Sequence, residues 1–518
     1  MGKSLDEIWN KIQKDLNDKK NAELENEKRL YESKEKLRQE YLRRNQMYEN
    51  ISLTSFSPSS SAAGGGSKQS QPQNQVDFIY WSLIFDEDSN GVGYVPQSMD
   101  QDPDGNIYVG SISLLNAQNS LVRKLSPSGD VLWEKTLSNT GSANMEIARV
   151  MAVPNDGGVI ILYRGAIRKL DTNGNLEWSF LQDNGSPVDF TACCLNVAAD
   201  NESFYVLGVS DDGLFQIASF DTYFGTRTLN RSIEINGETG YTSYVNMFLN
   251  SNNDIVVGLS YNVFTSATYW YTTIVVIESS SLSSGVNILN QWDLDPYEYS
   301  SLSSPGVNNQ NIRGLAIDIN DNIITCGYQS GITLIPQDFS VGVGLMLDIV
   351  LNSTSFEHKS LAVPNGTSGD VFIIGQDGPS VIKVVKLSSF VPQFSYTIES
   401  VSENGLSIEG ENSIANSCIK IVDGAMLITA SYDDGTPKEL LLKLPLTNLS
   451  GYPDTSSTTY GDFIFTNSPI IQNTIFPSTT TKSFSIDNNS SWLSNDVTQV
   501  SGFSSPSITQ TSTQTSFD

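Results

Sequence analysis

Short apolar runs separated by polar turns fill most of the chain, and one pattern recurs about seven times between residues 78 and 446. Each copy has a polar turn, a run of β-branched and aromatic residues that ends near a glycine, a second apolar run and then an aromatic residue. Runs of this composition between Gly, Asp, Asn and Pro are typical of β-strands. The pattern therefore predicts an all-β region built from small antiparallel sheets.

The first two copies show the pattern most clearly. The turn at 104–106 leads into the run 107–110, and the first copy ends at Trp133. The second copy ends at Trp178, after a turn at 171–174. Further apolar stretches predict an innermost strand for most units, so that each unit is expected to have four strands; the clearest are 192–197, 315–319 and 419–422. The later copies are expected at 204–208, 255–258, 323–327, 371–375 and 426–429.

An aromatic strand also precedes the first complete copy, at Phe78–Phe85. Repeated sheets cannot bury their faces alone, so they stack or close into a ring. An N-terminal strand that joins the last unit hides two sheet edges that would otherwise pair with other chains. We therefore expect residues 78–85 to close the ring beside Leu440–Leu444.

The repeats resemble those of a known group of folds. The turns at 104–106 and 129–130, with Trp133 and Trp178 after Gly129 and Gly174, are similar to the degenerate repeats of quinoprotein-like and related bacterial and viral β-propellers. This resemblance implies a propeller of about seven blades over 78–446. It also implies that the tryptophans pack between neighbouring blades rather than against a cofactor; these are Trp81, Trp133, Trp178 and Trp292.

The N-terminal segment has a different composition. Residues 1–50 are densely charged, have no glycine after Gly2 and no proline, and therefore predict one long α-helix that starts at a capping box over 4–7. One compact apolar face recurs at helical spacing and is the candidate partner-docking site; it consists of Leu5, Ile8, Trp9, Ile12 and Leu16. Docking on a large assembly, bundling with copies of itself and a solvated single helix all remain open.

Two low-complexity segments flank the predicted propeller. Residues 51–77 are rich in Ser, Gly, Gln and Pro, which is typical of a flexible linker without a core. Residues 447–518 are rich in Ser, Thr and Asn and carry few charges. This C-terminal segment is expected to be extended, and either disordered by itself or ordered against a partner.

The net charge also differs between the N-terminal segment and the rest of the chain. The protein carries 30 Lys and Arg against 58 Asp and Glu, a net charge of −28. Residues 1–50 hold 12 of the basic and 11 of the acidic residues, which leaves 18 and 47 for the rest and a balance of −29. A body this acidic repels phosphate backbones, so no nucleic-acid partner is expected.

Few residues suggest chemistry. The four cysteines, Cys193, Cys194, Cys326 and Cys418, fit no disulfide framework or zinc spacing and are expected to be buried in strands. The single histidine, His358, is expected on the surface of an outer strand, and neither a nucleophile elbow nor a phosphate-binding loop occurs. We therefore predict no catalytic, cofactor-binding or metal-binding residues.

Calcium is the one metal for which the sequence offers candidate loops. Residues 100–105 and 86–91 both match the first half of a calcium loop, yet Ser111 and Gln97 stand where the bidentate glutamate would be required. Asp and Gly are also the residues that a tight turn between strands demands. The plain turn is thus the main prediction, and a calcium loop is the alternative.

The parts together suggest a function. A charged helix, a flexible tether, an acidic propeller and a Ser/Thr/Asn-rich tail are similar in composition to structural proteins of tailed bacteriophages. This implies a non-enzymatic head or tail accessory protein whose helix docks on capsid, portal or tail proteins and whose propeller contacts a host surface or another protein. With no secretory signal and no membrane span expected, the chain would be made in the host cytoplasm and reside in the virion. A quinoprotein-like enzyme and a cytosolic propeller scaffold that binds a protein are the alternatives.

Overall fold

The computed structural model describes residues 81–504 with gaps, of which the longest are 182–192, 295–311 and 488–502. The chain divides into two compact units, Met1–Val76 and Asp77–Asp518, and the described residues all belong to the second. The predicted helix over 1–50, its docking residues and the predicted linker lie outside the described residues and stay predictions. Within the described ranges, no helix is long and apolar enough to cross a membrane.

The described strands form seven antiparallel sheets, and six of these are blades whose four core strands follow one another in the chain. Blades 1 to 3 contain β2 (Tyr94–Gln101), β3 (Ile107–Ser113), β4 (Asn119–Leu125) and β5 (Val131–Ser138); β6 (Ile147–Ala152), β7 (Val159–Tyr163), β8 (Ala166–Leu170) and β9 (Leu176–Leu181); and β10 (Cys193–Val197), β11 (Ser203–Val209), β12 (Phe215–Asp221) and β13 (Arg227–Ile235). Blades 4 to 6 contain β14 (Thr242–Leu249), β15 (Ile255–Phe264), β16 (Thr268–Ile277) and β17 (Ile288–Leu294); β18 (Ile312–Ile317), β19 (Ile323–Gly327), β20 (Gly331–Ile335) and β21 (Leu345–Leu351); and β22 (Phe356–Ala362), β23 (Asp370–Asp377), β24 (Val381–Ser388) and β25 (Val391–Ser400). A 3-10 helix, η1 (Ser279–Ser283), lies between β16 and β17.

The remaining sheet joins both ends of the ring. Its strands are β26 (Gly405–Ser407), β27 (Ile419–Val422), β28 (Ala425–Asp433), β29 (Pro437–Pro445) and β1 (Trp81–Phe85). β1 pairs with β29, and Leu83 lies opposite Leu441. The predicted closing strand beside Leu440–Leu444 is therefore confirmed for residues 81–85. The expected count of about seven similar units is corrected to six blades of consecutive strands, because this closing sheet borrows its outermost strand from the N-terminal side.

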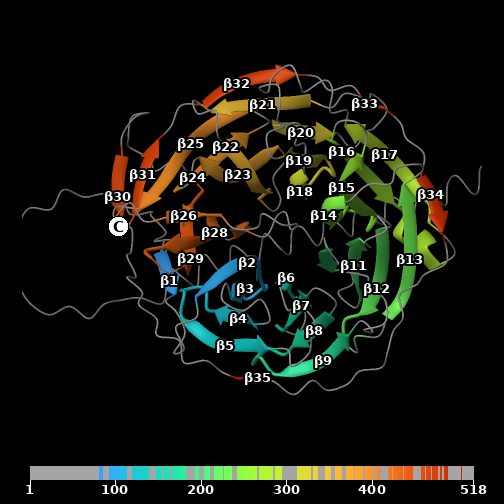
Figure 1. Cartoon of the computed structure of the whole chain (residues 1–518), viewed down its shortest axis with the longest axis horizontal. Helices are drawn as coiled ribbons and strands as arrows, with labels where there is room; N and C mark the ends of the chain where they lie inside the picture. The colour runs from blue at the N-terminus through green and yellow to red at the C-terminus, as the bar shows by residue number, and fades with distance from the viewer. Residues whose placement is uncertain are drawn as a thin grey trace, which may run out of the picture. The chain divides into compact units, whose positions relative to one another are not determined.

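The innermost strands form a closed series of contacts. β2 contacts β6, and the series continues through β10, β14, β18 and β22 to β27, which contacts β2 again. Figure 1 shows β2, β6, β14, β18 and β22 on the inner side of the ring, with β5, β9, β13, β17, β21 and β25 farther out. The protein is thus an all-β propeller, and the predicted inner strands at 192–197, 315–319 and 419–422 are confirmed as β10, β18 and β27.

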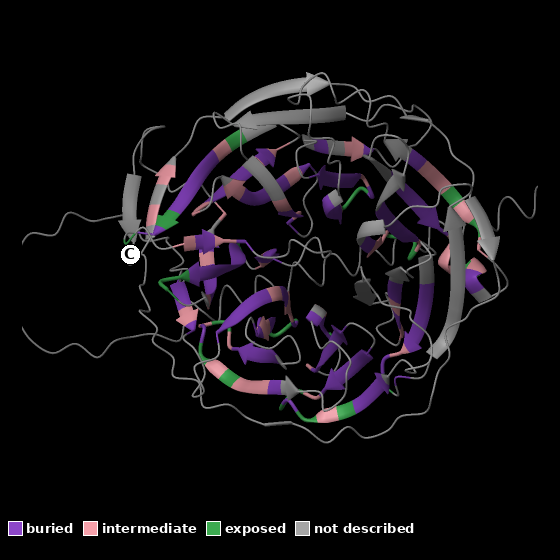
Figure 2. Ribbon diagram, in the orientation of Figure 1, coloured by how far each residue is buried: buried purple, intermediate pink, exposed green. Residues whose placement is uncertain are grey.

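Apolar faces of neighbouring sheets pack directly on one another. One cluster joins Trp178 and Phe180 of blade 2 to Phe204, Val206 and Phe220 of blade 3. Figure 2 shows most described residues of the inner and middle strands as buried, whereas β5 is mostly half-buried or exposed and β9 begins with a half-buried and an exposed residue. Burial of each such large side chain contributes about 1.5–3 kcal/mol, so packing between blades, rather than any one sheet, stabilises the ring.

Beyond the closing sheet, the chain runs back around the propeller and adds outer strands in reverse order of the blades. We call these strands the C-terminal belt: β30 (Ser457–Tyr460), β31 (Phe463–Asn467), β32 (Ile470–Ile475), β33 (Thr479–Thr480), β34 (Phe484–Asp487) and β35 (Phe503–Ser504). β31 pairs with β25, β32 with β21, β33 with β17, β34 with β13 and β35 with β5, while β30 pairs with β31. The segment expected to be disordered or ordered against a partner therefore pairs with its own propeller.

Removal of residues 447–518 is expected to leave the ring folded but to make the protein associate with itself. The deletion uncovers the backbone N–H and C=O groups of five outer strands, and uncovered strand edges pair with other chains. Light scattering after size-exclusion chromatography, over a range of protein concentrations, measures this. A chain that lacks only residues 505–518 keeps the belt and is the matched control. Identical mass distributions for both deletions would contradict an edge-covering role.

Candidate functional site

The turn between β2 and β3 is held by the carboxylate of Asp102. Its Oδ1 accepts hydrogen bonds from the backbone N–H of Asp104 at 3.1 Å and of Asn106 at 2.8 Å. Its Oδ2 accepts one from Asn106 Nδ2 at 2.9 Å and lies 3.6 Å from Lys124 Nζ. Both carboxylate oxygens are therefore used within the turn, as in other Asx turns. The plain-turn prediction for residues 100–105 is confirmed.

The same turn recurs around the propeller. Its first residue accepts hydrogen bonds from the backbone N–H groups two and four positions later, and the equivalent first residues are Asp171, Asn250 and Asp318. The second calcium candidate, residues 86–91, lies outside the described residues. Among the residues with described side chains, no group of three or more His, Cys, Asp or Glu is placed to hold a metal ion.

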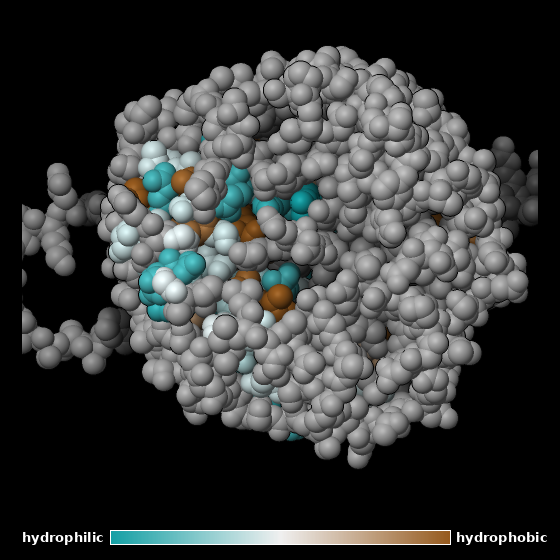
Figure 3. All heavy atoms as spheres, in the orientation of Figure 1, coloured by the Kyte–Doolittle hydropathy of each residue, from teal (hydrophilic) through white to brown (hydrophobic). Residues whose placement is uncertain are grey.

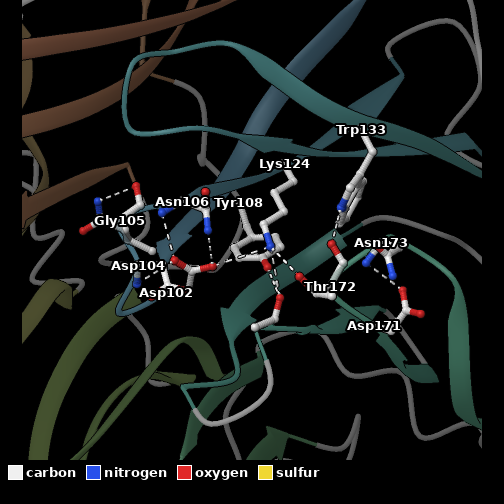
Figure 4. A network of polar contacts seen from close by, with 12 residues as sticks. Asp102, Asp104, Gly105, Asn106, Tyr108, Lys124, Trp133, Asp171, Thr172 and Asn173 are labelled. Atoms are coloured by element: carbon white, nitrogen blue, oxygen red, sulfur yellow. Dashed lines mark hydrogen bonds and ion pairs between the residues drawn. The ribbon is translucent and has the colours of Figure 1, made fainter.

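Trp133 on β5 contacts the turns of the next blade (Figure 4). Its Nε1 donates a hydrogen bond to the carbonyl of Thr172 at 2.9 Å. Lys124, which is paired with Trp133 across the strands, donates to the carbonyl of Gly157 at 3.2 Å and to Thr172 Oγ1 at 3.1 Å. The Tyr108 hydroxyl also donates to the carbonyl of Gly157. These contacts join blade 1 to blade 2.

Trp178 makes the same contact one blade later. Its Nε1 donates to the carbonyl of Thr222 at 3.1 Å, and a Cβ at Gly225 would lie 2.5 Å from its ring. Gly225 also has a φ of 64°, which favours glycine. Trp292 is buried in a cluster shared by blades 4 and 5. The prediction that these tryptophans pack between blades is therefore confirmed.

Trp81 completes the set in the closing sheet. It is fully buried, and Lys443 lies opposite it on β29. Here Lys443 Nζ, rather than the indole, donates to the turn of the next blade, at 3.2 Å from the carbonyl of Pro127. The indole Nε1 is buried without a hydrogen-bond partner among the described residues. The structural role predicted for Trp81 is confirmed, with the lysine taking over the polar contact.

Buried charges connect blade 1 with the closing sheet, a contact that we call the seam. Arg123 on β4 is 1% exposed, and its Nη1 lies 2.7 Å from Oε2 of Glu439, which is also 1% exposed. Its Nε lies 2.5 Å from Glu134 Oε1, its guanidinium covers the ring of Phe85 at 3.7 Å, and Ser111 Oγ donates to Glu439 Oε2 at 2.9 Å. Burial alone would lower the pKa of Arg123, but the two carboxylates raise it above its ordinary value, so the guanidinium stays charged.

Five inner strands carry a β-bulge near the strand's beginning. Each bulge places one extra residue between two registered pairs, and these residues are Gln97, Ala148, Ser243, Arg313 and Lys359. In several blades, the glycine near the end of the β-rich run of the repeat lies opposite the bulged part of the inner strand. At Gly110 a Cβ would lie 2.6 Å from Val150 of blade 2, so the absence of a side chain admits the next inner strand. Bulges of this kind redirect side chains and are frequent beside functional sites.

One ion pair spans the inner strands at the ring closure. Lys420 on β27 pairs with Asp100 on β2, and Asp100 Oδ2 also accepts a hydrogen bond from the backbone N–H of Ala152 on β6 at 2.8 Å. Ser98 Oγ accepts another from the N–H of Val150 at 2.9 Å. These contacts satisfy N–H groups on the free edge of β6. Desolvation lowers the pKa of Lys420 to about 8, although the adjacent carboxylate favours its charged form.

The cysteines lie in or directly beside the first two strands of their sheets. Cys326 and Cys418 are free and buried, Cys418 lying directly before β27, and burial raises the pKa of both thiols, that of Cys418 to about 11. Such thiols are protonated at neutral pH and are poor nucleophiles. Cys193 and Cys194 lie in β10. The outer-strand position predicted for His358 is wrong, because β22 is an innermost strand.

The inner strands combine charge, bulges and buried polar groups, and they are the candidate functional site. Their basic residues are Arg149, Arg313, Lys359 and Lys420, and their acidic residues are Asp100 and Glu357. Sequence reasoning missed this set, although a signal existed: basic residues recur in the inner-strand runs of a strongly acidic chain. The five predicted docking residues of the N-terminal segment lie outside the described part of the chain, so the structure brings none of them into this site.

Comparisons with known proteins assign no family and no function to the chain. No protein-family model and no curated protein sequence matches the chain. Among solved structures, the polysaccharide lyase Uly1 is similar at 9% identity and a TM-score of 0.42, over 71% of this chain and 99% of that one. The Pan2 WD40 domain of Neurospora crassa is similar at 10% identity and a TM-score of 0.39, over 68% and 90%. The assignment as a β-propeller therefore stands on the strand pairing described above.

Proposed function

We propose that this protein is a non-enzymatic structural component of a large particle, a virion-associated head or tail accessory. In this proposal residues 1–50 dock on capsid, portal or tail proteins through Leu5, Ile8, Trp9, Ile12 and Leu16. The propeller is displayed for contact with a host surface or another protein. The composition of the flanking segments supports association with a large particle, and the way in which the propeller is built supports a structural role.

The observation that carries the proposal is that the chain covers its own sheet edges. β1 pairs with the open side of β29, and the C-terminal belt pairs with five outer strands. Long uncovered edges invite pairing between chains, which a component present in many copies at high local concentration must avoid. A ring covered in this way suits a displayed, long-lived part of an assembly.

The test is sedimentation of assembled particles from host cells that produce them. The full chain is compared with a variant in which Leu5, Ile8, Trp9 and Ile12 are replaced by serine, because loss of the apolar face removes the docking surface without touching the propeller. Co-sedimentation of the full chain with the particles, and loss of most of the variant from that fraction, are expected. Immunoblotting of gradient fractions measures both.

The matched control exchanges Lys34 and Arg44 for serine, two residues of the same segment that lie beyond the five predicted docking residues. This control should sediment with the particles like the unchanged chain. If neither the full chain nor the control is found with particles, or if the four-serine variant stays fully bound, the particle proposal is wrong.

A further inference from the structure

The C-terminal belt passes one blade without a described partner strand. Its strands pair with the outer strands of blades 6, 5, 4 and 3 in turn, and its last strand, β35, pairs with blade 1. Blade 2 comes between the last two and has four described strands, with β9 at its outer edge. In Figure 1, β9 lies on the rim between β34 and β35. Among the described strands, none pairs with the outer side of β9, so its backbone groups can accept a further strand.

The chain between β34 and β35 is long enough to supply that strand. The belt strands from β31 to β34 are joined by short connections, which are residues 468–469, 476–478 and 481–483. Residues 488–502 separate β34 from β35, in a step that leads from blade 3 to blade 1. Two connections of the usual length leave room within this segment for one strand of the size of the other belt strands.

The sequence of this segment suits a belt strand. The described belt strands are rich in Ser, Thr, Ile and Phe and carry few charges. Residues 497–500, with the sequence Val-Thr-Gln-Val, have the same character, and β-branched residues favour strands. This run ends two residues before β35, which is also the spacing between β31 and β32.

The end of β9 is the part that corresponds to the belt contacts in other blades. The belt pairs with residues 396–400 at the end of β25, with 232–235 at the end of β13 and with 136–137 near the end of β5. In β9, Ser179 lies in this part and is 1% exposed, and its Oγ has no hydrogen-bond partner among the described residues. Burial of an unpaired hydroxyl is costly, and a strand beside β9 would bring polar backbone groups to this edge.

No broad apolar patch among the described side chains competes with this edge as a docking surface. The large apolar side chains that are exposed there belong to four different blades; they are Leu132, Tyr223, Leu289 and Ile319. In the space-filling view, hydrophilic and hydrophobic described residues lie side by side (Figure 3). An open strand edge binds through its backbone instead, and an extended segment is the occupant that matches it.

We propose that residues 488–502 pair with the outer side of β9 and give blade 2 its fifth strand, so that the C-terminal belt encircles all six blades. The occupant is this chain because β34 and β35 hold the two ends of the segment on the neighbouring blades. A strand tethered at both ends has a high effective concentration at β9, which a second molecule lacks. The inference does not rest on the proposed particle function, because it concerns the propeller alone.

Hydrogen exchange of the full chain, followed by mass spectrometry of fragments that cover β9 and residues 488–502, tests the pairing. In the test variant, residues 491–500 are replaced by Gly-Ser repeats of equal length, which keep β34 and β35 connected but favour no strand. Both fragments should exchange slowly in the unchanged protein. The outward-pointing amides of β9 should exchange about tenfold faster or more in the variant, because they lose their hydrogen-bond acceptors.

The same replacement at residues 505–514, beyond β35, is the matched control and should leave the exchange of β9 unchanged. Fragments of β7, which is paired on both sides, verify that each variant is folded. Thr498→Pro and Gln499→Pro, tested separately, are milder variants. They remove N–H groups that point to opposite sides of a strand, so at least one of them should expose the same amides of β9.

Three results would overturn the proposal. The first is fast exchange of all outward-pointing β9 amides in the unchanged protein. The second is equal exchange of β9 in the unchanged chain, the test variant and both proline variants. The third is protection of β9 that disappears on dilution, since this would identify a second copy of the chain as the occupant.

Discussion

Replacement of Arg123 by methionine is expected to lower the free energy of unfolding by about 3–5 kcal/mol. The substitution keeps an unbranched, apolar side chain over Phe85 but leaves Glu439, 1% exposed, without its counter-ion. One oxygen of Glu439, Oε1, already has no hydrogen-bond partner among the described residues, so little remains to compensate the charge. Urea unfolding followed by tryptophan fluorescence measures the loss.

Lys438→Met is the matched control for the seam. Lys438 precedes Glu439 on the same strand and pairs with Asp434 at 2.7 Å near the surface. Exposed pairs of this kind contribute at most about 1 kcal/mol. In the double variant Arg123→Met with Glu439→Gln, the total loss of unfolding free energy should be smaller than the sum of the two single losses. Each single replacement leaves the other partner as a buried charge without its counter-ion, whereas the double variant leaves neither of the two charges. Additive losses, or a loss below about 1 kcal/mol for Arg123→Met, would contradict the seam as a stabilising contact.

Removal of residues 1–85 is expected to destabilise the propeller more than any single substitution. This deletion takes away β1, whose Trp81, Leu83 and Phe85 are each at most 2% exposed. Loss of one large buried aromatic side chain alone costs about 3–5 kcal/mol, and the deletion also uncovers the edge of β29. Differential scanning calorimetry should show a strongly lowered Tm together with aggregation on heating.

Removal of residues 1–76 is the matched deletion, because it leaves β1 in place. That shortened chain should unfold at the same Tm as the full protein. A synthetic peptide of residues 77–85, added in excess to the chain that lacks 1–85, should raise its Tm, since a strand that binds only the folded ring stabilises it by mass action. Equal Tm values for the two deletions would show that β1 does not close the ring.

Local sequence was sufficient to predict strands, turns and packing residues. Asp102 and Asn106 satisfy each other within one five-residue turn, so their roles can be inferred from neighbours in the chain. The tryptophan that follows a turn glycine has one place in such a repeat, against the next blade, and Trp133 and Trp178 occupy it. His358 was assigned to an outer strand because it lies beside Glu357 in a polar run, and local sequence alone does not tell such a run from an innermost strand.

The seam could not be predicted from the sequence. Ser111 and Glu439 form a hydrogen bond although 328 positions separate them, and Arg123 reaches the same carboxylate from a different sheet. Polar residues in strands are usually taken as solvent-facing, because burial of a charge is costly unless a partner is present. Only closure of the ring supplies that partner.

The sequence by itself determined that this protein is an all-β repeat closed by its own N-terminal strand, because strand, turn and aromatic signals are local and recur at a regular interval. The tertiary structure alone decided the reverse course of the C-terminal belt and the buried seam. Backbone pairing of the belt depends on exposed edges rather than on side-chain pattern, so a Ser/Thr/Asn-rich segment carries little sign of it. Arg123 and Glu439 meet only because closure of the ring brings blade 1 against the closing sheet.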